Sequence, residues 1–157
     1  MAQEIERKFL VRGEDWRDLA RGKAYRQGYL SAGPGVTVRV RTAGGRGLLT
    51  IKGPSVGATR AEYEYEIPLA DANEMLDSLC ARPLIDKQRC KIAHGGLVWE
   101  VDEFFGDNQG LIIAEVELDD EARQVVLPAW VGEEVTGDPR YYNANLVRHP
   151  YREWRDR

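Results

Sequence analysis

Apolar and polar residues alternate with a period of two along eight stretches of this chain, and glycine-rich turn sequences separate most of them. Because successive side chains of a strand point to opposite faces, such alternation is typical of half-buried antiparallel strands. The predicted strands are 3–12, 24–31, 36–43, 47–53, 60–68, 84–93, 97–105 and 111–118. Eight strands joined mostly by hairpins predict a closed or nearly closed antiparallel sheet.

Three short helices are expected beside these strands. The segment 71–80 begins with Asp71 and has Glu74 three residues later, a variant of the capping box. The apolar stripe expected to lie against the sheet consists of Met75, Leu76 and Leu79. The other two candidates are 14–20 and 141–148. The predicted fold class is therefore α+β, mainly antiparallel β, with a few short helices packed outside the barrel.

The polar positions of seven of these strands carry charged residues, mostly of one sign within a strand. Like charges two residues apart on a strand lie about 7 Å apart and repel. A single charged face is usually a solvated face of a sheet, but its repetition on seven strands indicates a function. The acidic positions are Glu4, Glu6, Glu62, Glu64, Glu66, Glu100, Asp102, Glu115 and Glu117, and the basic positions are Lys8, Arg39, Arg41, Lys52, Lys87, Arg89 and Lys91.

If the sheet closes with helices outside, these charged positions line the interior of the barrel. Removing an ion from water costs on the order of several kcal/mol unless a partner compensates. Carboxylates suit hard divalent cations such as Mg²⁺, and Arg and Lys suit phosphate oxygens. The pattern therefore predicts a site that holds a polyphosphate together with cations.

Length and charge limit the alternatives. A chain of 157 residues is expected to form one domain, 1–157. Its net charge of −4 disfavours nucleic acid as a partner, although a local basic groove remains compatible with it. We expect no membrane partner, because no stretch approaches about 18 apolar residues and nothing near Met1 resembles a signal peptide. Cys80 and Cys90 fit no disulfide framework or zinc spacing, which favours a cytoplasmic protein.

The segment EIERKF, which contains Glu4, Glu6 and Lys8, resembles the ExExK signature of the CYTH domain, or triphosphate tunnel metalloenzyme, family. The resemblance implies a closed tunnel of eight antiparallel strands that acts on triphosphates with Mg²⁺ or Mn²⁺. Short bacterial members are similar to this chain and typically hydrolyse inorganic triphosphate (tripolyphosphate). Further matching segments follow in the family's order over essentially the full chain: RQGYL (26–30), VRVR (38–41), TIKG (50–53), RAEYEYEI (60–67), DKQR (86–89), EVD (100–102), AEVEL (114–118) and RYYNANL (140–146).

The resemblance also implies roles for individual residues. The implied metal ligands are Glu4, Glu6, Glu115 and Glu117, with Glu62 and Glu64 as acids near the site. The implied phosphate clamp consists of Arg39, Arg41, Lys52, Lys87 and Arg89, with Lys8 near a terminal phosphate. We expect two ions, one bridging phosphate oxygens and one activating a water.

Several roles stay open at this point. Asp102 is either a metal ligand or the partner that orients Arg89. Tyr29 either assists proton transfer with Lys8 or simply lines the tunnel. Arg140 and Asn143 are expected near one tunnel mouth, where the C-terminal helix would either close the tunnel or only pack on the barrel. The tail 151–157 has no assigned role beyond packing of Trp154.

The leading function is metal-dependent hydrolysis of the terminal phosphate of tripolyphosphate by a monomer or homodimer. The same tunnel would also serve a class IV-type adenylyl cyclase, or a thiamine or nucleoside triphosphatase. A non-catalytic polyphosphate- or nucleotide-binding module is a third possibility. A pure anion binder has no use for Glu4, Glu6, Glu115 and Glu117, because without metal they repel phosphate. The acids therefore favour an enzyme.

Overall fold

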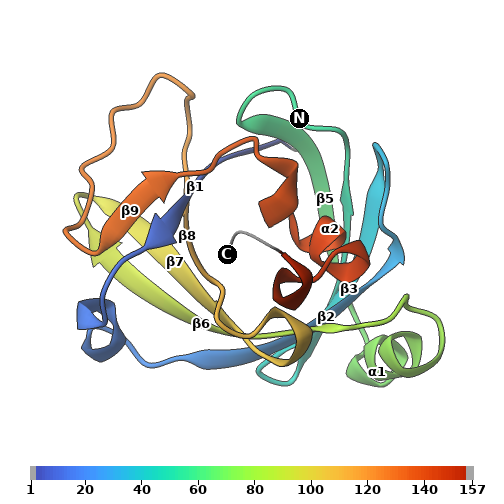
Figure 1. The fold of residues 1–157 in the computed structure, drawn as a ribbon. Coiled ribbons are helices and arrows are strands. Elements are labelled where there is room, and N and C mark those ends of the chain that lie inside the picture. The colour runs from blue at the N-terminus through green and yellow to red at the C-terminus, as the bar shows by residue number, and fades with distance from the viewer. Residues whose placement is uncertain (1–2, 155–157) are drawn as a thin grey trace.

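A computed structural model describes residues 3–154, and within it nine antiparallel strands form one sheet that closes on itself (Figure 1). The order around the barrel is β5-β4-β3-β2-β6-β7-β8-β1, and pairing of β1 with β5 completes the ring. The predicted eight-stranded barrel is confirmed, with each strand within one residue of its predicted bounds. The strands are β1 (Gln3–Val11), β2 (Lys23–Ser31), β3 (Thr37–Ala43), β4 (Arg46–Lys52), β5 (Thr59–Ile67), β6 (Ile85–His94), β7 (Leu97–Phe104), β8 (Ile112–Glu117) and β9 (Val131–Glu134).

The ninth strand, β9, lies outside the eight-stranded ring and was not predicted. It pairs with the end of β1 at Phe9 and Val11. The sequence VGEE is too short to show an alternating pattern. β9 also explains the charge of Arg7 on the outer face of β1, because Arg7 Nε and Nη2 donate to the Glu134 carboxylate at 2.9 and 2.8 Å.

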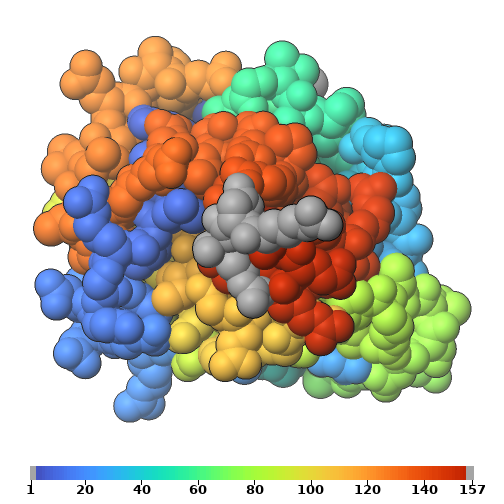
Figure 2. All heavy atoms as spheres, in the orientation of Figure 1, coloured from blue at the N-terminus to red at the C-terminus, as the bar shows by residue number. Residues whose placement is uncertain are grey.

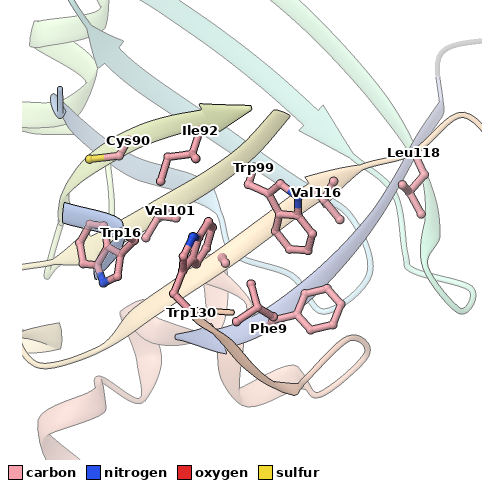
Figure 3. Close-up of a cluster of buried hydrophobic side chains, with 11 residues drawn as sticks. Phe9, Trp16, Cys90, Ile92, Trp99, Val101, Val116, Leu118 and Trp130 are labelled. Atoms are coloured by element: carbon pink, nitrogen blue, oxygen red, sulfur yellow. The ribbon is translucent and has the colours of Figure 1, made fainter. Parts of the chain in front are cut away.

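The apolar face of β1, β6, β7 and β8 packs on the outside of the tunnel wall (Figure 3). Phe9 and Trp99 lie with ring centroids 5.5 Å apart, and Trp99 meets Trp130 edge-on at 6.0 Å. The predicted helix 14–20 is a 3₁₀ helix, Asp15–Asp18, which buries Trp16 against the same cluster. The face of β1 that contains Phe9 therefore points outward, and the charged face points into the barrel, as predicted for the charged positions.

Helix α1 (Leu69–Ser78) packs outside the barrel, as Figure 1 shows. It begins earlier than predicted, directly after Pro68, and Asp71 lies in its first turn rather than at the N-cap. Proline is disfavoured inside a helix because it lacks an N–H donor, so a start immediately after it is favoured. The predicted stripe is partly wrong, since Ala72 and Leu76 are buried whereas Leu79 remains exposed.

Gly47 on β4 permits the close approach of α1. A Cβ atom at Gly47 would lie 2.8 Å from Ala72 Cβ and 3.0 Å from the Ile67 carbonyl oxygen. We expect Gly47→Val to lower the free energy of unfolding by about 1–3 kcal/mol through overpacking, as measured by urea denaturation. Gly53→Val is the matched control, because its nearest neighbour would be 3.5 Å away. Equal losses in both variants would contradict this account.

The C-terminal segment crosses one end of the barrel. It contains the 3₁₀ helices η3 (Pro139–Tyr141) and η4 (Tyr151–Glu153) on either side of helix α2 (Asn143–Arg148). Figure 1 shows α2 inside the outline of the ring, and in Figure 2 the red atoms of this segment lie over the same part of the ring. Of the two alternatives that the sequence left open for the C-terminal helix, the position of α2 across the barrel end favours closing of the tunnel, whereas α1 packs outside the barrel as predicted.

The inward-facing positions at this end of the barrel explain where α2 lies. Ile85, Phe104 and Ile113 occupy the same face as the charged residues of β6, β7 and β8, but they are apolar and fully buried. They form one cluster with Leu146 and Val147 of α2. Burial of these side chains stabilises α2 across the barrel end, and Trp154 packs on the same cluster. Residues 155–157 of the tail lie outside the described range.

The remaining helix is η2 (Gly106–Asn108), a single 3₁₀ turn between β7 and β8. None of the helices within residues 3–154 is both long and apolar enough to cross a membrane.

Candidate active site: a charged tunnel

The interior of the barrel contains two adjoining cavities of about 280 and 300 Å³. The first lies at the α2 end and the second lies toward the opposite end. They meet in the middle of the barrel, because the same charged side chains line both. These shared residues are Glu6, Arg39, Arg41, Lys52, Arg89 and Glu115.

The two cavities differ in charge. Eight basic and only two acidic side chains line the first, which we call the anion cavity. Seven basic and seven acidic side chains line the second, which we call the mixed cavity. A concentration of basic groups inside a low-dielectric wall attracts anions strongly, so a chain with a net charge of −4 still contains a site suited to phosphate.

Asp102 on β7 holds two cations of the phosphate clamp. Its carboxylate accepts bonds of 2.7 and 2.8 Å from Arg89 Nε and Nη2, and Lys87 Nζ lies 2.8 Å away. Although burial would raise the pKa of Asp102, Lys87 and Arg89 lower it. A fully buried carboxylate engaged in this way orients the two cations, which favours the orienting role over the metal-ligand role for Asp102.

The three arginines of the clamp lie close enough to influence one another. Burial, together with the nearby charges of Arg39 and Arg89, lowers the pKa of Arg41 to about 9. Tyr25 separates two of them, with the guanidinium carbons of Arg41 and Arg89 4.8 and 4.9 Å from its ring centroid. Arg39 Nε is buried and lacks a hydrogen-bond partner within residues 3–154. Three arginines that repel one another, one of which has an unused N–H donor, are suited to bind a polyanion.

Tyr25 was not predicted as a site residue. The sequence does place Tyr25 on the same face of its strand as Tyr29, because the two residues are four positions apart. No row of charged residues marks either face of this strand as the inner one. The ring of Tyr25 stacks on two arginines from different strands and so fixes their spacing.

The acids of β1 and β8 differ in their neighbours. Glu4 accepts bonds of 2.9 and 3.2 Å from Lys52 Nζ, which lowers its pKa against the opposing effect of burial. Glu115 lies 3.6 Å from Lys8 Nζ, and its pKa is also lowered despite burial. Glu6 is less compensated, since burial and the nearby Glu115 raise its pKa to about 8.

The remaining acids line the mixed cavity. Burial and repulsion from Glu4 raise the pKa of both Glu62 and Glu117. Glu64 accepts a 2.8 Å bond from the Thr50 hydroxyl and a 3.5 Å bond from Arg39. Glu62 and Glu117 are therefore only partly compensated, although basic and acidic side chains are equal in number around this cavity.

These carboxylates fit a hard divalent cation by their chemistry. The raised pKa values of Glu6, Glu62 and Glu117 reflect burial and, after it, repulsion between carboxylates, and a bound cation would offset both. Between residues 3 and 154, no three Asp, Glu, His or Cys side chains converge as a metal-binding group. Glu4 and Glu115 are instead turned toward lysines, so metal binding would draw carboxylates away from these partners.

The α2 end of the anion cavity adds residues that the sequence analysis did not select. Arg60 on β5 shares the inward parity of Glu62, and its Nε lies 3.6 Å from Glu4. Tyr142 places its ring 5.4 Å from Lys8 Nζ. Asn143 lines this cavity as expected, and so does Tyr29.

Arg140 was expected near the tunnel mouth but lies elsewhere. Its Nη2 donates to Asp138 at 3.0 Å, and its guanidinium lies 5.4 Å from the ring centroids of both Tyr141 and Trp154. It is absent from the residues that line the two tunnel cavities. Arg148 lines the anion cavity near the loop after β2 instead.

The CYTH domain model matches residues 2–151 of this chain. An inorganic triphosphatase from Acetivibrio thermocellus is 52% identical over 156 residues, which cover 99% of this chain and 100% of that protein. An inorganic triphosphatase from Nitrosomonas europaea is 37% identical over 149 residues, covering 92% and 96%. A crystal structure of the inorganic triphosphatase NE1496 superposes with a TM-score of 0.64 at 33% identity, covering 94% of this chain and 95% of that one. The chain belongs to the CYTH domain family.

Proposed function

We propose that the protein is a metal-dependent triphosphatase that hydrolyses the terminal phosphate of inorganic triphosphate inside the tunnel. The observation that carries this proposal is the adjacency of a strongly basic cavity to a set of under-compensated carboxylates. Two relatives at 52% and 37% identity are named inorganic triphosphatase, and this supports the choice of substrate.

The metal ligands in this proposal are carboxylates of the tunnel. Glu4, Glu6, Glu115 and Glu117 would hold Mg²⁺ or Mn²⁺, with Glu62 and Glu64 nearby and two ions as the proposed number. When bound, such ions neutralise charge on phosphate oxygens and lower the pKa of a coordinated water.

The phosphate clamp binds and orients the substrate. Arg39, Arg41 and Arg89 present planar, positively charged groups that match phosphate oxygens, and Lys52 and Lys87 add point charges. Asp102 keeps Lys87 and Arg89 in one orientation before substrate arrives, so less ordering is needed on binding.

The two lysines near the substrate differ in their suitability for proton transfer. Glu115 and Glu6 raise the pKa of Lys8 against the effect of burial, so Lys8 stays charged and suits a contact to a terminal phosphate. Burial lowers the pKa of Lys87 to about 7 even though Asp102 opposes the shift. A general base works best with a pKa near the working pH. A bound polyanion raises the pKa of Lys87 and returns it to the charged form, so we place Lys87 among the phosphate contacts rather than as the proton acceptor, and Tyr29 as a cavity-lining residue.

Substrate binding at pH 8 should involve proton uptake by Lys87. With a pKa of about 7, Lys87 is largely neutral at pH 8 in the free protein, and a bound polyanion raises that pKa. Calorimetric titration with tripolyphosphate in two buffers of different ionisation enthalpy measures the protons taken up. Lys87→Arg remains charged throughout and serves as the control. We expect the wild type to take up more protons than this variant, and equal uptake would contradict the lowered pKa.

The proposed function is tested by a phosphate-release assay across four substrates. Tripolyphosphate, pyrophosphate, ATP and thiamine triphosphate are compared with Mg²⁺ and with Mn²⁺. We expect tripolyphosphate to be hydrolysed much faster than the other three. Equal or greater turnover of ATP would contradict the substrate assignment, and cyclic AMP detected by mass spectrometry would favour a cyclase instead.

A further inference from the structure

Gln27 on β2 is fully buried in the tunnel wall, and both polar atoms of its side chain are hydrogen-bonded. Its Oε1 accepts a 2.9 Å bond from Arg41 Nε, and its Nε2 donates a 2.9 Å bond to Asn143 Oδ1. A buried amide costs free energy unless its polar atoms have partners. Here one partner belongs to the phosphate clamp and the other is the first residue of α2.

The chemistry of the groups fixes the direction of this chain of bonds. Arginine only donates, so Gln27 must turn its oxygen toward Arg41 and its NH₂ toward Asn143. Asn143 must then present its oxygen, and the same oxygen accepts a 3.1 Å bond from Lys87 Nζ. A single chain of hydrogen bonds, Arg41–Gln27–Asn143–Lys87, therefore joins two cations of the clamp through α2.

The helix is arranged around this contact. Asparagine is among the best N-cap residues, yet Asn143 lies one position inside α2, and the N-cap residue Tyr142 makes no side-chain capping bond. The side chain of Asn143 is directed into the tunnel instead. At the other end of α2, Arg148 Nη2 donates to the Ala32 carbonyl oxygen at 2.9 Å. Both ends of the helix are thus tied to β2 or the loop after it.

We propose that Gln27 is a positioning residue that couples α2 to the phosphate clamp, so that an anion in the anion cavity orders the helix that closes it. The inference rests on the proposed function, because it places the phosphates of the substrate against Arg41 and Lys87. An ammonium group has three donors, so Lys87 holds Asn143, Asp102 and one phosphate oxygen together. Fixing Arg41 and Lys87 on phosphate then fixes Gln27 and Asn143 between them.

Gln27→Met tests the coupling, because it keeps the length of the side chain and removes both hydrogen bonds. Hydrogen exchange of the α2 amides is measured with and without tripolyphosphate in the absence of metal. In the wild type we expect tripolyphosphate to slow this exchange, whereas in Gln27→Met it should bind without slowing it. With metal present, kcat/KM should fall about tenfold in Gln27→Met, the scale of one lost hydrogen bond to a charged group. Gln88→Met, on the exposed face of β6, is the matched control and should behave as the wild type.

Asn143→Ala breaks the same chain at its other end and provides an independent test. Because both residues act through one chain, the Gln27→Met/Asn143→Ala double variant should lose no more kcat/KM than Gln27→Met alone. Additive losses in the double variant would overturn the coupling. So would protection of α2 by tripolyphosphate that survives in Gln27→Met or Asn143→Ala. A wild type in which tripolyphosphate does not slow exchange of α2 would overturn it as well. If Gln27→Met does not fold, Asn143→Ala alone decides the question. A wild type that shows the protection but releases no phosphate would contradict the proposed function and leave the coupling supported.

Discussion

Replacing Glu4 and Glu6 together by glutamine is expected to abolish turnover of tripolyphosphate while leaving its binding intact. Loss of the metal ligands should remove several kcal/mol of transition-state stabilisation, which corresponds to a fall in kcat of about 10³-fold. Binding should survive because the phosphate clamp is untouched. The loss of the negative charge of Glu4, which is paired with Lys52, also reduces repulsion of the anion. Phosphate release measures the first effect, and calorimetric titration without metal measures the second.

A matched double variant removes two carboxylates that lie outside the tunnel cavities. Glu66 pairs with Arg46 at the exposed end of β5, and Glu103 pairs with Arg17 on the outer face of β7. Glu66→Gln with Glu103→Gln should retain turnover within about twofold, since exposed ion pairs contribute little. Activity that survives in the Glu4/Glu6 variant would show that these two residues are not essential metal ligands.

Replacing Asp102 by asparagine is expected to cause the largest loss of stability. The change leaves Lys87 and Arg89 buried without their shared counter-ion, and breaking a buried ion pair in this way costs about 3–5 kcal/mol. Because the pKa of Asp102 is lowered in the fold, its contribution is present above the ordinary carboxyl pKa and is lost as pH falls through the lowered value. Urea unfolding at pH 7 measures the effect.

Glu100→Gln is the control for Asp102, because Glu100 also contacts Arg89, at 3.2 Å, but is partly exposed. We expect it to lose less than about 1 kcal/mol. The comparison also decides between the two roles left open by the sequence. A metal ligand at Asp102 would give Asp102→Asn near-normal stability without metal, together with lost metal-dependent activity.

The alternation of apolar and polar residues along the chain predicted most of the fold and much of the tunnel lining. Parity alone placed Glu6, Arg39 and Lys87 on one inner surface, because a strand cannot turn alternate side chains to the same face. The same rule also places Tyr25 and Arg60 on the inner face of β2 and β5. Neither residue belongs to a row of like charges, since Tyr25 is uncharged and Arg60 is opposite in sign to Glu62.

The parts that could not be predicted depend on contacts between distant segments. β9 is defined by pairing with β1 rather than by its own sequence, so the partner of Arg7 was hidden. The position of α2 follows from an apolar surface made by Ile85 and Phe104, which belong to strands whose other inner residues are charged. The two roles left open for Asp102 could be separated only once β6 and β7 were paired in register, with Arg89 opposite Asp102.

The proposed reaction is hydrolysis of the terminal phosphate of tripolyphosphate inside the tunnel with the help of a divalent metal. Phosphorus NMR of tripolyphosphate incubated with the protein, with and without Mg²⁺ or Mn²⁺, tests it most directly. With metal, we expect orthophosphate and pyrophosphate in equal amounts and no further breakdown of pyrophosphate. Without metal, we expect unchanged tripolyphosphate. Equal turnover in the presence of a chelator, or tripolyphosphate left intact under all conditions, would contradict this proposal.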